Sequence, residues 1–397
     1  MTATTYTRLE ESVLQSIEKN KKTYIDVSYR IHENPETGNE EVFASNLLCS
    51  LLEDAEFEIE RNIPEHETAF IARKSSAKPG LKVGYLAEYD ALPGLGHACG
   101  HNIIGTTSVA AAIAVGKVID EIGGEVAVLG TPAEEGGVNG SAKGTFVRHG
   151  LVQDFDACMM VHPLGRTTGS AETLAVDPID FEFFGKSAHA AANPEEGINA
   201  LDGIIQLFNG INALRQHVTD DVRIHGIILD GGQAPNIVPD YARARFFIRA
   251  ATRNACNVIT EKVERIAEGA ALVTGSTYKF TRIQNGVDNF YVTPRFDEVF
   301  SEKAKRLGEN YVEDRQGIGS TDAGNISQVV PTIHPYIKIG PESLVAHTNE
   351  FREAAKSEKG DQALITGAKA LALTGLDLYT KPELLQEIKK QYQEGKL

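Results

Sequence analysis

Cysteine is scarce in this chain of 397 residues, and its spacing excludes two common kinds of cysteine site. The only cysteines are Cys49, Cys99, Cys158 and Cys256, and no two of them form a CxxC pair. A zinc ribbon and a thioredoxin-like redox site both need such closely spaced pairs, so neither is indicated. Reduced thiols fit this spacing better, and we expect a cytoplasmic protein.

Basic residues and long apolar runs are also few. The chain has 39 Lys and Arg against 55 Asp and Glu, for a net charge of −16, and its basic residues are scattered rather than clustered. This balance argues against nucleic acid and anionic membranes as partners. No apolar run approaches the roughly 20 residues of a membrane span. The opening residues MTATTYTRLEES also lack the apolar core of a signal peptide.

The length predicts two domains, because single hydrophobic cores stop growing beyond roughly 250–300 residues. Apolar spacing predicts alternating helices and strands, which favours an α/β fold with a doubly wound sheet. The helices are expected at 7–32, 40–55 and 103–122, and the strands at 69–73, 81–87, 125–131 and 156–161.

The region 178–286 has a different pattern, with strands and helices in the order βαββαβ. This is the ferredoxin-like order, so we expect an inserted second domain there. The first domain then comprises 1–177 and 287–397. Its second part is predicted to contain a helix at 297–308, a strand at 333–339, a loop at 340–350 and a helix within 351–376.

The stretch YLAEYDALPGLGHACGHN, residues 85–102, places Asp90, His97, Cys99 and His101 on a turn-rich loop after a buried strand. Gly100 permits an unusual φ between Cys99 and His101, so that both side chains can turn toward one ion. Thiolate and imidazole are both good zinc ligands. A buried cysteine with ordinary loop histidines is the alternative for this stretch alone.

Further ligand types follow other predicted strands. Each of them alone is readily explained as a solvated loop residue, but all fall where open α/β sheets bind their ligands. Together they predict a metal centre. The adjacent carboxylates Glu134 and Glu135 follow strand 125–131, His162 follows strand 156–161, and His347 lies in the loop PESLVAHTNEF.

At these residues the sequence resembles a known family over nearly its whole length. The matching segments are DALPG…HACGH, TPAEEGG, VHP, GKSAHAAANPEEGINAL, PNIVPD, GSTDAGN and LVAHTNEF, in that order. They resemble the dinuclear-metal aminoacylase and carboxypeptidase family, in the branch with hippurate hydrolase and indole-acetyl-amino-acid hydrolase. Asn102 and GSTDAGN depart from the hippurate pattern and look more like p-aminobenzoyl-glutamate hydrolase and β-alanyl-dipeptidase-like members.

The resemblance implies a zinc-exopeptidase-like catalytic domain, in which a mixed sheet is flanked by helices, with an inserted dimerisation and lid domain. It implies two divalent ions per chain, zinc or manganese, with cobalt and nickel also compatible with this ligand set. Glu134 would be the general base acting on a metal-bridged water, and Asp90 would support the ligands from behind. The implied ligands are Cys99, His101, Glu135, His162 and His347.

The resemblance also implies roles in the inserted domain. His189 would stabilise the oxyanion, often from the partner subunit of a homodimer, although a capping or packing imidazole is the alternative. Asn236 would contact the substrate carbonyl or carboxylate. Arg249 is a weaker carboxylate candidate, since several arginines of the same region can form a solvated face. The expected substrate is a small N-acyl amino acid or dipeptide.

Two other functions remain open at this point. In the first, Cys99 is the nucleophile of a thiol hydrolase with His101 or His97 as its base, although the sequence offers no third orienting group. In the second, the protein is a non-catalytic peptide-binding relative that keeps the fold. The intact ligand set together with Glu134 argues against this second function.

Overall fold

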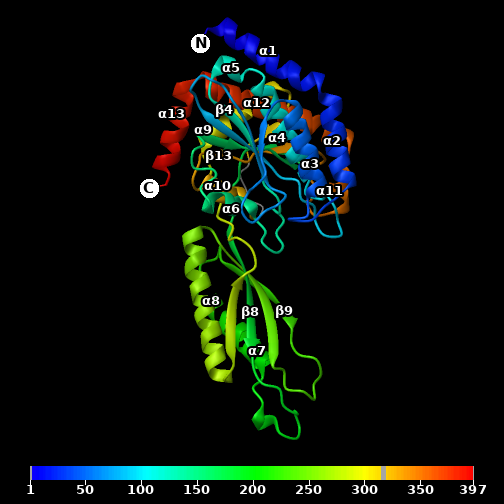
Figure 1. The fold of residues 1–397 in the computed structure, drawn as a ribbon. Helices are drawn as coiled ribbons and strands as arrows, with labels where there is room; N and C mark the ends of the chain where they lie inside the picture. The colour runs from blue at the N-terminus through cyan, green and yellow to red at the C-terminus, as the bar shows by residue number, and fades with distance from the viewer. Residues whose placement is uncertain (1, 314–318, 397) are drawn as a thin grey trace. The chain divides into compact units, whose positions relative to one another are not determined.

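The computed structural model describes residues 2–313 and 319–396, and the contacts within it divide the chain into two compact units (Figure 1). The first unit combines Met1–Glu172 with Phe290–Ile318 and Asp322–Leu397. The second comprises Thr173–Asn289 and Gly319–Thr321, and the predicted insertion at 178–286 lies within it.

A six-stranded mixed sheet forms the centre of the first unit. Its order is β1-β2-β4-β3-β5-β13; β4, β3, β5 and β13 run parallel, and β1 and β2 pair antiparallel. This confirms the predicted mixed α/β fold. The strands are β1 (Glu58–Glu60), β2 (Phe70–Ser75), β3 (Lys82–Ala87), β4 (Glu125–Gly130), β5 (Ala157–Met159) and β13 (Thr332–Ile333).

Alternating side chains of this sheet enter two separate hydrophobic cores, because successive residues of a strand point to opposite faces. Val83 and Val128 belong to a core that includes residues of the helices Ala3–Lys19, Lys21–Glu33, His101–Gly116, Pro294–Arg306 and Glu358–Thr380. Leu86 and Leu129 belong to a second core with residues of the helices Ala142–Arg148 and Ala323–Ser327. Both faces of β3 and β4 are therefore buried, as their nearly continuous apolar sequences require.

Helices and a small sheet complete the first unit. The small sheet has the order β12-β7-β14-β6, formed by β6 (His162–Leu164), β7 (Thr167–Thr168), β12 (Tyr311–Val312) and β14 (Tyr336–Lys338). The helices are α1 (Ala3–Lys19), α2 (Lys21–Glu33), α3 (Val42–Asp54), α4 (His101–Gly116), α5 (Ile119–Ile122), α6 (Ala142–Arg148), α9 (Pro294–Arg306), α10 (Ala323–Ser327), α11 (Asn349–Ala354), α12 (Glu358–Thr380) and α13 (Pro382–Glu394).

The second unit has the predicted ferredoxin-like order, with an antiparallel sheet β11-β8-β10-β9. Every second residue of β10 is buried, and these side chains share a core with residues of α7 and α8. The elements are β8 (Ala175–Phe184), η1 (Pro194–Glu196), α7 (Ala200–Leu214), η2 (Arg215–His217), β9 (Arg223–Asp230), β10 (Tyr241–Ala250), α8 (Arg253–Thr274) and β11 (Thr277–Arg282).

Several predicted element boundaries are wrong, and local chemistry explains most of them. The expected helix 7–32 is broken at Asn20, whose side-chain amide donates to the Ser16 carbonyl. The expected strand 333–339 is divided by Pro335, which has no amide hydrogen to continue a ladder. The strands expected at 69–73 and 81–87 are present as β2 and β3, and β4 lies between them in the sheet. The region 351–376 contains parts of two helices, and α13 follows them.

Candidate metal centre

The candidate site begins where β3 and β4 end. The two strands run parallel with Ala87 opposite Gly130, so the segments that follow them leave the same edge of the sheet side by side. One segment carries Glu88 and Asp90, and the other carries Glu134 and Glu135. The register therefore brings together carboxylates that lie more than 40 residues apart in the chain.

Gly100 joins Cys99 to the first residue of α4, His101, and has a left-handed backbone with φ of 77°. The predicted unusual φ at this glycine is confirmed. A side chain here would also be blocked sterically, because a Cβ atom would lie 2.4 Å from Cγ of Pro163. Glycine therefore both permits the turn and lets the segment at His162 and Pro163 approach closely.

Asp90 connects two of the predicted ligands. Its Oδ1 lies 2.8 Å from His101 Nδ1, and its Oδ2 accepts a hydrogen bond of 2.9 Å from the backbone N–H of Glu135. A carboxylate on Nδ1 fixes the ring and leaves Nε2 as the free electron-pair donor, a common arrangement behind metal-ligating histidines. This geometry supports the expected positioning role of Asp90.

A strained turn precedes the two adjacent glutamates. Ala133 has φ of 57°, which is unusual for a residue with a side chain. Its N–H donates to Glu41 Oε1 at 2.9 Å, and its carbonyl accepts from Ser141 N at 2.7 Å. Glu41 is itself buried and accepts from the Thr68 hydroxyl. These contacts hold the turn that directs Glu134 and Glu135 into the site.

The five predicted ligands converge in the first unit, and their donor atoms face one another. Sγ of Cys99 lies 3.4 Å from Nε2 of His162, whose Nδ1 donates to the Pro163 carbonyl. Nε2 of His347 lies 3.4 Å from Oε1 of Glu135. Two groups drawn only from these five residues have all their donor atoms within 4.8 Å of one another: Cys99, His101 and His162, and Cys99, Glu135 and His347.

The donor set fits divalent cations. His101 Nε2 and Glu135 Oε1 are buried without a hydrogen-bond partner among the described residues. Buried polar atoms are normally paired, so such convergent unpaired atoms are expected where an ion completes the site. The mixture of sulfur, nitrogen and oxygen suits zinc and its neighbours among the transition metals.

The environment separates the acidities of the two adjacent glutamates. Burial, together with the charges of Glu88 and Glu135, raises the pKa of Glu134 well above its usual value. Burial acts in the same direction on Glu135, but His347 and His101 lower its pKa below the usual value. Such a division between neighbouring carboxyl groups is typical of a site that uses one for proton transfer and the other as an anion.

A buried ion-pair cluster beside the site was not found from the sequence. Lys143 Nζ lies 2.7 Å from Glu88 Oε1 and 2.5 Å from Asp322 Oδ1, and all three side chains are almost fully buried. Although burial opposes it, Asp322 and Glu88 raise the pKa of Lys143, so it remains an ammonium. The sequence indicates this cluster only weakly, in that Glu88 directly follows a predicted strand and lies two residues before Asp90.

Asn102, the departure from the hippurate pattern, has a structural role. Its side-chain amide donates to the Ser28 hydroxyl at 2.9 Å and to the Ala355 carbonyl at 3.1 Å. An ionised aspartate could not donate to that carbonyl. Asn102 therefore ties the start of α4 to α2 and to the segment that follows α11.

His189, Asn236 and Arg249 lie in the second unit. His189 is exposed, and its Nδ1 accepts from the backbone N–H groups of Ala191 and Ala192 at 3.2 and 3.1 Å. The neutral ring then carries its proton on Nε2. The backbone of Asn236 accepts from Ala190 N at 3.1 Å, so Asn236 neighbours this histidine segment. Arg249 Nη1 donates to Ser320 Oγ at 2.8 Å.

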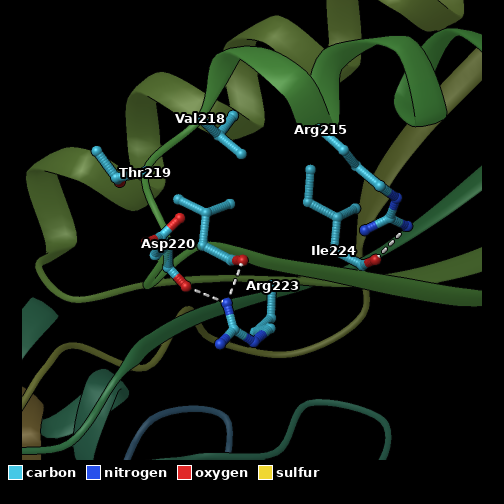
Figure 2. A pocket seen from close by; sticks show the side chains of 7 residues that line it. Arg215, Val218, Thr219, Asp220, Arg223 and Ile224 are labelled. Atoms are coloured by element: carbon cyan, nitrogen blue, oxygen red, sulfur yellow. Dashed lines mark hydrogen bonds between the residues drawn. The ribbon is translucent and has the colours of Figure 1, made fainter.

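Figure 2 shows a pocket of the second unit that includes none of the predicted site residues. Two arginines line it, and both donate to nearby backbone carbonyls. Arg215 donates to Ile224, and Arg223 donates to Asp220 and Val222. Because these bonds stabilise the link between η2 and β9, we assign the pocket no function.

The mixed α/β fold and this cluster of metal-ligand candidates are typical of a metallopeptidase, and the comparisons identify the family. The family model described as peptidase family M20/M25/M40 matches residues 85–374. This chain belongs to that family, as its resemblance to the dinuclear-metal group predicted. It is a metal-dependent hydrolase of amide bonds.

Named relatives and one solved structure agree with the family. The chain is 38% identical to mouse Xaa-Arg dipeptidase over 82% of this chain and 78% of the relative. It is 29% identical to one of the subunits of p-aminobenzoyl-glutamate hydrolase from Escherichia coli K12, over 96% and 94% of the two chains. A dinuclear metal binding M20 peptidase from Bacillus subtilis shares the fold, with a TM-score of 0.64, 21% identity, and coverage of 91% and 99%.

Proposed function

We propose that this enzyme hydrolyses the amide bond of dipeptides or small N-acyl amino acids at the site formed by Cys99, His101, Glu135, His162 and His347. The observation that carries the proposal is the convergence of these five donor side chains beside Glu134 at one edge of the sheet. Two divalent ions per chain, zinc or manganese, fit the two overlapping groups of donors.

Divalent ions held here would lower the pKa of a water molecule and polarise the scissile carbonyl. The chain itself supplies the proton transfer. Glu134 is the proposed general base, because its carboxylate lies beside the candidate ligands His101 and Glu135 and can accept a proton from water and deliver it to the leaving amine. Glu135, held as an anion by His347 and His101, is the proposed ligand.

The thiol-hydrolase alternative has less support. Burial and the nearby Glu135 raise the pKa of the Cys99 thiol well above its usual value, so the free thiol is a poor nucleophile. A bound cation would deprotonate the same thiol and explain why it faces His162 at 3.4 Å.

The substrate class is tested with a panel of amides. Because the named relatives include an Xaa-Arg dipeptidase and a p-aminobenzoyl-glutamate hydrolase, the panel contains dipeptides with basic C-terminal residues, β-alanyl dipeptides, N-acyl amino acids and p-aminobenzoyl-glutamate. We expect the metal-loaded protein to release the free amino acid from at least one class. Failure to hydrolyse any of them would contradict the proposal.

We also propose a homodimer formed through the second unit. β9 is an edge strand of its sheet, and no other strand of the described residues pairs with its outer side. Ile227, Ile228 and Leu229 on this strand are 60%, 47% and 43% exposed. An apolar edge strand of this kind can pair with the same strand of a second copy.

No helix in 2–313 or 319–396 is long and apolar enough to cross a membrane. All four cysteines are unpaired, which supports the predicted cytoplasmic location.

We propose that His189 donates a hydrogen bond from Nε2–H to the oxyanion in the partner subunit's site. We also propose that the side chains of Asn236 and Arg249, in the same unit as His189, bind the substrate. Exchange of subunits between His189→Ala and Glu134→Gln proteins then restores one complete site in each mixed dimer. We expect about a quarter of wild-type activity from a random mixture, since half the dimers are mixed and half their sites are intact.

The control mixture combines Glu134→Gln with Cys99→Ala, two changes in the same unit. It should recover no activity, because every site retains at least one defect. If proven exchange between the His189 and Glu134 variants also restores nothing, His189 acts within its own chain or not at all.

A further inference from the structure

Lys143 is a lysine without exposed side-chain surface, and two carboxylates hold its ammonium. It lies in the first turn of α6, and Asp322 lies directly before α10. Asp322 contacts it twice, through Oδ1 to Nζ at 2.5 Å and through Oδ2 to the backbone N–H at 3.2 Å. The aspartate therefore fixes both ends of the lysine and determines where its charge lies.

The second carboxylate, Glu88, lies between Lys143 and the metal centre. Its Oε1 is 2.7 Å from Lys143 Nζ, and its Oε2 is 3.5 Å from Nε2 of His101, a proposed ligand. Glu88, Glu134 and Asp322 each offer an oxygen within 4.8 Å of the others. Three carboxylates thus surround one position, beside the two groups of proposed ligands.

Glu88 and Asp322 are buried and Glu134 is partly buried. Carboxylates at this separation repel one another and need a cation or protons to be stable. Oxygen clusters of this kind bind divalent ions when nothing else compensates their charge. Here the chain supplies its own compensation, since the ammonium already contacts two of the three carboxylates. A divalent ion would have to displace Lys143 in order to enter.

We propose that Lys143 is a positioning residue whose ammonium occupies a third cation position, formed by Glu88, Glu134 and Asp322. The ammonium thereby prevents Glu88 from binding the metal ions and limits the centre to two ions. This inference rests on the proposed two-ion site. It adds a role for three residues, Lys143, Glu88 and Asp322, that the proposed reaction does not use directly.

The test counts ions in Lys143→Met, which keeps an unbranched side chain but removes the charge. Wild type and variant are stripped with chelator, reconstituted with Mn²⁺, desalted, and analysed for manganese per folded chain. We expect the variant to bind about one ion more than wild type, because the carboxylate cluster then accepts a divalent ion in place of the ammonium. The same count as wild type in folded Lys143→Met would overturn the proposal.

Lys303→Met is the matched control. Lys303 is also buried in the first unit and forms an ion pair of 2.5 Å with Asp377, outside the groups of metal-ligand candidates. Both variants lose a buried ion pair, so both should unfold at a lower temperature than wild type. Only Lys143→Met should gain an ion. An equal gain in both variants would show that the additional ion does not depend on the Glu88 cluster.

A charge-balanced double variant keeps the proposal testable if Lys143→Met does not fold. Lys143→Met with Asp322→Asn removes one positive and one negative charge and leaves Glu88 without its ammonium. Glu88 should then join the metal ligands, so the half-time of ion release to excess chelator should lengthen about tenfold, a typical effect of residues around a metal site. Release at the wild-type rate or faster would overturn the proposal, and adding Glu88→Gln should abolish the gain.

The wild-type measurement separates this inference from the proposed function. Wild-type protein that binds no divalent ion after reconstitution would contradict the two-ion site itself. Wild-type protein that binds two ions, with no change in the Lys143 variants, would leave the proposed function intact and reject only the role of Lys143.

Discussion

Replacement of Glu134 by Gln is expected to lower turnover by roughly 10²- to 10⁴-fold, the range typical of a lost general base. Gln keeps the size of the side chain and some hydrogen bonding, but it cannot accept a proton at neutral pH. Glu134 is proposed to contact water rather than hold an ion, so metal content should stay near the wild-type value. The measurements are turnover at saturating metal and metal analysis of the same preparation.

Glu135→Gln is the matched comparison, because the two side chains are adjacent and similarly buried, at 13% and 11% exposure. Their contacts differ, since Oε1 of Glu135 faces Nε2 of His347 at 3.4 Å. Glu135→Gln should therefore lose metal first and recover part of its activity as metal is added. If Glu134→Gln loses its ions and Glu135→Gln keeps them, the proposed roles of these glutamates are exchanged.

Removal of metal is expected to abolish turnover, and Cys99→Ser should reproduce this effect at ordinary metal concentrations. Cys99 belongs to both groups of proposed ligands, so its loss weakens both positions. Outer-sphere partners of a metal are worth about 10- to 100-fold in affinity, and a direct ligand should be worth at least as much. The measurement is the dissociation constant of each ion by competition with a chelator, together with activity in EDTA.

Cys158→Ser and Cys49→Ser are the controls for this change. Both cysteines are buried in hydrophobic cores, and neither belongs to the candidate metal groups of the described residues. Their variants should lose stability while retaining metal affinity and activity after correction for folded protein. Equal loss of metal in all three variants would point to a folding defect, and full activity in EDTA would contradict the metal-dependent reaction.

The fold was predictable wherever the spacing of apolar residues along the sequence reflects which side chains are buried. β10 alternates strictly between buried and partly exposed residues, and the order of elements around it identified the ferredoxin-like sheet. The partners of β3 were not predictable in this way. Its two neighbours, β4 and β5, begin about 40 and 70 residues later, and only long-range packing selects them. The break at Asn20 was missed because the apolar spacing continues across it.

The candidate ligands could be selected from the sequence because they are distinctive residue types on loops that follow predicted strands, and because their motifs resemble those of a known family. The ion-pair cluster was not. Lys143 and Asp322 lie 179 residues apart, and a lysine in a glycine-rich segment looks like an exposed loop residue. Only the packing of α6 against α10 reveals that its charge is fully buried. A residue that positions other side chains is therefore harder to recognise in the sequence than a residue of a typical metal-ligand type.

The first unit is built from the two ends of the chain, and this has a consequence for how the enzyme matures. During synthesis, the second unit can be completed from one continuous segment, Thr173–Asn289, with Gly319–Thr321 added later. The first unit cannot be completed before β13 and β14, which pair with β5 and β6, and before His347, the last proposed ligand. The set of five proposed ligands is therefore complete only after His347 has been synthesised. Metal capture then stabilises only the finished molecule, since ions that bind the folded state shift the folding equilibrium toward it.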